Sequence, residues 1–146
     1  MNNTYVPLIS SGVAGPLGVL HLPHLWLKTS LEARGKLAPG YPGCGKGYDQ
    51  MVLDGIGLDR QKVLDYIKTN RPSYPQFESW IKQQPGVKLD PAGVKKLNDS
   101  IVGYNHDDAT RTSILTANGI SGNSPADAVN LNNLDDWNEF HQAALK

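Results

Sequence analysis

Three side chains that can transfer protons or attack a substrate stand at or near expected helix starts. They are His21, Cys44 and Asp49. An imidazole beside a carboxylate is an acid–base pair, and a thiolate beside an imidazolium is a nucleophile. If the helices beginning near residues 21 and 48 pack with these ends together, the three side chains form one polar cluster. We therefore take them as candidate catalytic residues, with His21 as the acid–base group, Cys44 as nucleophile or second acid–base group, and Asp49 as the orienting carboxylate.

A glycine-rich loop over residues 39–47 brings further polar groups to the same region. The helix that follows it presents free N–H donors and a partial positive charge at its start, which lowers the pKa of a nearby thiol. We expect such a lowered pKa for Cys44. The side chains that we expect to bind a substrate in the cluster are His24, Lys46, Tyr48 and Gln50.

The same loop matches a phosphate-binding motif except at its last position. Gly40, Gly45 and Lys46 fit G-x-x-x-x-G-K-[ST], but Gly47 stands where the motif has a hydroxyl that holds Mg²⁺. A phosphate loop also needs a buried strand before it, and here the end of a helix and a proline precede it. We therefore do not expect nucleotide hydrolysis.

Each candidate also has a purely structural explanation. Cys44 could be a small buried apolar residue, Asp49 could satisfy the first turn of its helix, and His21 could be a helix cap or a core histidine. A metal site is the weakest alternative, because Pro23 places His21 and His24 at an irregular helix start and no second close pair of ligands exists. No cofactor motif is visible. A small-metabolite enzyme, a non-catalytic module for a metabolite or a partner protein, and a structural subunit all remain open.

The elements that must position these residues are predicted to be helices. Apolar residues recur at helical spacing between capping residues, and no segment shows the alternation of a strand. We predict an all-α fold: one compact domain over residues 21–146, with six to eight short helices, preceded by an extended Gly/Pro-rich arm over residues 1–20. Trp26, Trp80 and Trp137 stand at core spacing. The predicted helices cover residues 21–37, 48–56, 60–68, 74–84, 92–104, 109–119, 126–131 and 136–146, with caps at Asp59, Ser73, Asp90, Asp107 or Asp108, Ser124, and Asn133 or Asp135.

Composition excludes several partner classes. The 14 basic and 14 acidic residues give zero net charge, so no basic field would attract nucleic acid or an anionic membrane. The first 20 residues lack the basic start and the continuous apolar run of a secretory signal. The single cysteine cannot form an internal disulfide. These features favour a cytoplasmic protein and leave the oligomeric state open.

Several motifs together resemble a known bacterial family. They are "GVLHLPHLWLK" over 18–28, Cys44, "DQ" at 49–50, "GIGLD" over 55–59, "ESWI" over 78–81 and "LDDWNEF" over 134–140. In this respect the chain resembles the family called domain of unknown function 5069, and the resemblance spans most of the domain. It implies a small, mainly helical bacterial protein and no particular activity. His24 stands where that family has arginine, and the spacing from Cys44 to Asp49 includes Lys46 and Gly47.

Overall fold

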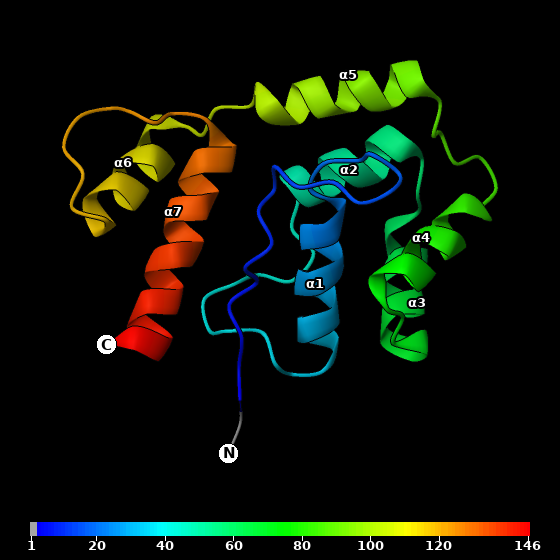
Figure 1. Cartoon of the computed structure of the whole chain (residues 1–146), viewed down its shortest axis with the longest axis horizontal. Coiled ribbons are helices and arrows are strands. Elements are labelled where there is room, and N and C mark those ends of the chain that lie inside the picture. The colour runs from blue at the N-terminus through cyan, green and yellow to red at the C-terminus, as the bar shows by residue number, and fades with distance from the viewer. Residues whose placement is uncertain (1–2) are drawn as a thin grey trace.

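The computed structural model describes residues 3–146, and these residues form seven α-helices followed by one short π-helix (Figure 1). Isolated β-bridges are their only extended pairings, so the described chain contains no sheet. The prediction of a single all-α domain is confirmed. The helices are α1 (Leu22–Ala33), α2 (Tyr48–Ile56), α3 (Arg60–Asn70), α4 (Tyr74–Lys82), α5 (Pro91–Val102), α6 (Asp108–Ala117), α7 (Ala128–Phe140) and η1 (His141–Leu145).

Five of the helices are capped at their start by a residue whose side chain accepts a hydrogen bond from the backbone N–H three residues later in the chain. These capping residues are Asp59, Ser73, Asp90, Asp107 and Asp127. Ser73 also forms the reciprocal arrangement in which the Gln76 side chain accepts from the Ser73 N–H. The first four caps are as predicted, because capping is decided by neighbouring residues alone.

The last long helix differs from the prediction. Two helices were expected, with caps at Ser124 and at Asn133 or Asp135, but α7 is continuous from Ala128 and its cap is Asp127. Asp135 therefore lies in the middle of the helix, so its interpretation as a cap is wrong. The Asn- and Asp-rich sequence resembles a helix start, but the surrounding residues continue the helix through it.

The core forms around α1, which lies between α2, α3 and α4, while α5 crosses one end of the molecule over α2 (Figure 1). Gly55 on α2 permits the close approach of α5, since a Cβ there would lie 2.7 Å from Leu97 Cδ1. The helices α6 and α7 pack together beside this group. The fully buried side chains include Leu22, Leu25, Val52, Leu53, Ile56, Phe77, Ile81 and Ile101.

The three tryptophans do not share one environment. Trp26 and Trp80 pack against the core as predicted. Trp137 is 59 % exposed, so its assignment to the core is wrong. Phe140 and Leu145, which also stand at positions suited to burial, are exposed. One end of α7 therefore presents apolar side chains outward.

The N-terminal arm runs along the helices rather than away from them (Figure 1). The Leu17 N–H donates to Glu78 on α4, and the Leu20 N–H donates to Asn98 on α5. Tyr5 pairs with Leu37 through a parallel bridge. Residues 1 and 2 of the predicted arm lie outside the described residues. None of the helices formed by residues 3–146 has the length and apolar character that crossing a membrane requires.

The two phenylalanines provide a matched test of this core. Phe77 is fully buried and Phe140 is 36 % exposed. We predict that Phe77→Ala lowers the free energy of unfolding by about 3 to 5 kcal/mol, because it removes packing and leaves a cavity. Phe140→Ala should cost less than about 1.5 kcal/mol. Urea unfolding followed by circular dichroism measures both, and equal losses would contradict this arrangement of the core.

Candidate functional site

His21 lies immediately before α1 with its backbone in the left-handed region, at φ 70°. Its side chain is only 3 % exposed. The ring nitrogen Nε2 lies 2.6 Å from Asp49 Oδ1, and Nδ1 lies 2.8 Å from Ser11 Oγ. Because an ionised carboxylate only accepts, Nε2 carries the proton and donates to Asp49, and the Ser11 hydroxyl donates to Nδ1. The imidazole thus joins the arm to α2.

Asp49 receives two further donors at its other oxygen. Oδ2 lies 2.7 Å from Lys28 Nζ on α1 and accepts from the Gly45 N–H at 2.6 Å. Burial by itself raises the pKa of Asp49, but the hydrogen bond from His21 and the charge of Lys28 outweigh it and hold that pKa well below its usual value. We call Ser11, His21, Lys28, Gly45 and Asp49 the Asp49 network.

Both histidines near the network are neutral at pH 7. Burial lowers the pKa of His21 by more than the Asp49 carboxylate raises it. Burial, together with the neighbouring His21, lowers the pKa of His24 to about 4. The His24 Nδ1–H donates to the carbonyl of Ile9 at 2.5 Å, which fixes a second point of the arm. The network therefore holds an ion pair between Lys28 and Asp49 and a neutral imidazole.

The order Ser11, His21, Asp49 resembles a nucleophile–base–carboxylate chain, but its surroundings differ from those of a working one. Ser11 and His21 are each 2 % exposed, so the groups face one another rather than a substrate. Lys28 also neutralises the carboxylate that would stabilise an imidazolium. As it stands, the network can join three segments of the chain. Proton transfer to a ligand would require the arm to move away.

Cys44 does not have the expected environment. Its thiol is half-buried against the core, and burial together with the Asp49 carboxylate raises its pKa. The expectation of a lowered pKa is therefore wrong. No hydrogen bond joins the thiol to His21 within residues 3–146. The carbonyls of Cys44 and Gly45 instead accept from the Arg60 guanidinium, which ties the loop to α3.

The four predicted substrate-binding residues separate into two groups. His24 and Tyr48 adjoin the network, with ring centroids 5.0 Å and 5.2 Å from that of His21. The Tyr48 hydroxyl is already used, since it donates to the Ile101 carbonyl at 2.6 Å. Lys46 is exposed, and Gln50 bonds to Asp54 and Arg60. The structure therefore brings His21, His24, Tyr48 and Asp49 together and leaves Lys46 and Gln50 outside that group.

Sequence reasoning missed Ser11 and Lys28. Lys28 had a usable signal, because it stands seven residues after His21 and shares the inward stripe of α1 with Leu25. A lysine at that position needs a buried acidic partner. Ser11 had no such signal, since its place depends on how the arm folds back over α1.

A second buried polar contact lies between the glycine-rich loop and α7. The Tyr41 hydroxyl donates to Asp136 Oδ1 at 2.8 Å, and Asp136 is 6 % exposed. Burial raises the pKa of Asp136 to about 7, against the lowering effect of the Tyr41 hydrogen bond. Neighbouring Asp135 and Glu139 raise this pKa further, whereas Lys28 lowers it. Asp136 therefore titrates near neutral pH.

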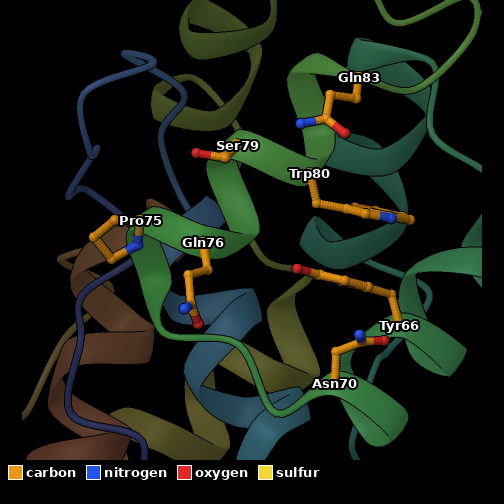
Figure 2. A pocket seen from close by; sticks show the side chains of 7 residues that line it. All are labelled: Tyr66, Asn70, Pro75, Gln76, Ser79, Trp80 and Gln83. Carbon is orange, nitrogen blue, oxygen red and sulfur yellow. The ribbon is translucent and has the colours of Figure 1, made fainter.

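Open cavities occur away from the Asp49 network. One, of about 450 Å³, lies beside α3 and α4 (Figure 2). Its walls include Tyr66 and Trp80, whose rings stack with centroids 4.4 Å apart and planes 5° from parallel. Uncharged side chains complete the lining, and we call this the amide pocket: Tyr66, Asn70, Pro75, Gln76, Ser79, Trp80 and Gln83. Within the described part of the chain, no group of three or more His, Cys, Asp or Glu side chains is arranged to hold a metal ion.

No protein-family model matches this sequence, and comparison with curated proteins gave no match.

The first prediction from the site concerns Asp49→Asn. If Asp49 served mainly a site, this change would cost little stability. The structure indicates a larger loss of stability, because the asparagine amide cannot accept from all three donors. The substitution also leaves the Lys28 ammonium buried without its charge partner. Removing one member of a buried pair costs about 3 to 5 kcal/mol. We expect a loss of this size in urea unfolding.

Lys28→Met in the Asp49→Asn background is the matched test. It removes the stranded ammonium and keeps an apolar stem, so the double variant should be more stable than Asp49→Asn alone by at least about 1 kcal/mol. A loss of stability below about 1 kcal/mol for Asp49→Asn would instead indicate that the carboxylate serves a functional site and does not hold the fold together.

The second prediction concerns Asp136→Asn and pH. The pKa of Asp136 is higher in the folded chain, about 7, than the ordinary value of 3.8 for an aspartate. The folded state therefore holds the proton more tightly, and this carboxyl lowers stability as pH rises from about 4 to 7. Asparagine keeps an acceptor for Tyr41 and has no charge. The stability of Asp136→Asn relative to wild type should rise by at least about 1 kcal/mol between pH 5 and pH 8. A pH-independent difference would contradict the burial of an ionising carboxyl.

Proposed function

We propose that the protein is a binding module for a small, uncharged polar molecule, which it holds in the amide pocket beside α3 and α4. The Asp49 network then serves as the scaffold that holds the arm, α1 and α2 together. Among the three functions left open by the sequence, this is the non-catalytic metabolite-binding module.

The lining of the amide pocket carries this proposal. Asn70 and Gln83 offer carboxamides, Gln76 offers its carboxamide N–H groups because its oxygen already accepts from the Ser73 N–H, and Ser79 offers a hydroxyl. The lining thus supplies donors and acceptors without a formal charge. The stacked pair of Tyr66 and Trp80 adds apolar surface (Figure 2). Its volume of about 450 Å³ lies within the range of small-molecule sites, and its lining is more polar than is usual for them, which suits a polar ligand. A phosphorylated or carboxylated metabolite would find no cation in this lining.

The closed geometry of the Asp49 network argues against the enzymatic alternative. A general acid or base must come within hydrogen-bonding distance of the atom it protonates or deprotonates. His21 instead uses both ring nitrogens inside the protein, and Tyr48 uses its hydroxyl. The raised pKa of Cys44 keeps its thiol protonated at neutral pH, which disfavours nucleophilic catalysis.

Three broader assignments accompany this function as proposals. Membership of the bacterial family called domain of unknown function 5069 is supported by the motifs over residues 18–28 and 55–59 and by Asp49. A cytoplasmic location is supported by the use of a single cysteine. The absence of nucleic acid as a partner is supported by the zero net charge.

NMR titration tests the binding function. The probes are methyl β-glucopyranoside, uridine and glucose 6-phosphate, of which the last is a charged counterpart of the first. We predict saturable shifts of the Trp80 indole N–H and the Asn70 and Gln83 amides with at least one uncharged probe, and none with the phosphate. Asn70→Ala should weaken that binding at least fivefold, since it removes hydrogen bonds without disturbing the core.

Gln61→Ala provides the control, because Gln61 is an exposed carboxamide on the same helix that lies outside the pocket lining. Its binding should equal that of the wild type. If no uncharged probe shifts these resonances, or if the phosphate binds equally well, the assignment of this pocket to an uncharged polar ligand is wrong.

A further inference from the structure

A second large cavity lies between the N-terminal arm and the C-terminal end of α7. Its volume is about 530 Å³, which is also in the range of small-molecule sites. The arm, the end of α7 with η1, and residues 38 and 39 after the Tyr5–Leu37 bridge all line it. We call this the arm cavity. Its apolar lining includes Tyr5, Val6, Leu8, Ala38, Pro39, Phe140, Ala143 and Ala144.

Large apolar side chains of the arm cavity remain in contact with solvent. Tyr5 is 49 % exposed, Leu8 44 % and Phe140 36 %. Apolar surface removed from water stabilises a complex by about 25 cal/mol for each Å². The cavity therefore offers a driving force for an apolar group that enters between the arm and α7.

A smaller acidic cavity adjoins the arm cavity. Its volume is about 200 Å³, and it shares Pro39 and Glu139 with the larger one. Tyr41 and Asp135 also line it. A ligand could thus place an apolar body in the arm cavity and a polar end beside Glu139 and Asp135.

The carboxyl groups at this end lack a positive partner. No ion pair involves Asp135, Asp136 or Glu139 within residues 3–146. The cation that lowers the pKa of Asp136 is Lys28, which is already paired with Asp49 at 2.7 Å. Glu139 influences both aspartates from α7 itself, and His106 influences Asp135 from the loop before α6.

Burial and the closeness of these carboxyls raise the pKa values of Asp135 and Asp136. Burial, together with Glu139, raises the pKa of Asp135, and burial together with Asp135 and Glu139 raises that of Asp136. Negative charge is therefore disfavoured here by burial and by the neighbouring carboxyls. A ligand that brings a cation relieves the repulsion, whereas an anionic ligand increases it.

We propose that the arm cavity and the adjoining acidic cavity bind a primary amine that carries an apolar body. The apolar body packs against Tyr5, Leu8 and Phe140, and the ammonium group lies between Glu139 and Asp135. An ammonium has three donors, and the acidic cavity provides the carboxylate oxygens that can accept them. This inference concerns a different part of the molecule from the amide pocket and does not depend on the function proposed there.

Calorimetric titration with octylammonium chloride at pH 8 tests the proposal. Two compounds with the same eight-carbon chain serve as comparisons. Octanoate carries a negative charge, and 1-octanol carries no charge. We expect saturable binding of octylammonium at least tenfold tighter than that of octanoate. Glu139→Gln should weaken octylammonium binding about threefold to tenfold and leave 1-octanol binding unchanged. Asp65→Asn, at an exposed carboxylate of α3, is the control for net charge. It should change neither octylammonium binding nor 1-octanol binding.

A second variant tests the apolar half. Ala143→Phe fills space in the arm cavity and should weaken octylammonium and 1-octanol alike, with an unchanged far-UV circular dichroism spectrum. Absence of saturable octylammonium binding would overturn the proposal. So would equal binding of octanoate, or a Glu139→Gln variant that binds octylammonium as the wild type does.

Discussion

The burial of the Asp49 carboxylate is the constraint on which much of this structure depends. A charged carboxylate removed from water is costly unless donors surround it. Here the donors come from three places: the imidazole of His21 before α1, the ammonium of Lys28 two turns later, and the backbone of Gly45 in the loop. Meeting that single requirement fixes how α1 and α2 face one another. Through Ser11, it also fixes where the arm lies.

This constraint explains why polar residues suited to catalysis end in a closed network. Two of the groups that the sequence indicated for their chemistry are fully engaged by other protein groups: His21 by Ser11 and Asp49, and the Tyr48 hydroxyl by the Ile101 carbonyl. Such a satisfied network makes the local structure rigid and specific. The open cavities lie beyond it, where loosely engaged side chains remain able to meet a ligand. Rigidity and ligand access are thus divided between different parts of one small domain.

The sequence predicted the fold well because its signals are local. Capping residues such as Asp59 and Asp90, and the apolar spacing behind them, act within a few residues and needed no knowledge of tertiary packing. The break expected inside α7 was wrong for a related reason, since Asp135 has the chemistry of a cap but the helix is already capped at Asp127.

The candidate site was harder to predict because it depends on distant contacts. Grouping His21 with Asp49 was correct as geometry, and it followed from placing two helix starts together. The prediction of a lowered pKa for Cys44 was wrong because burial and the nearby carboxylate of Asp49 outweigh the effect of the helix start. Neither Ser11 nor the amide pocket has a local signature. Ser11 meets His21 only when the arm lies against α1, and the lining of the amide pocket comes together only when α3 and α4 are packed.

The reach of the arm across the sequence has a consequence for synthesis of the protein. Leu20 is bonded to Asn98, 78 residues further along the chain, and Leu17 to Glu78, 61 residues further. Because a ribosome adds about 5 to 20 residues per second, the acceptor for Leu20 emerges roughly 4 to 16 s after Leu20 itself. Glu78 emerges earlier than Asn98, so Leu17 can be bonded before Leu20 is. The hydrogen bonds that tie residues 17–20 to α4 and α5 therefore form later than those that join residues 9–13 to His21 and His24, whose partners are made within a few residues of one another.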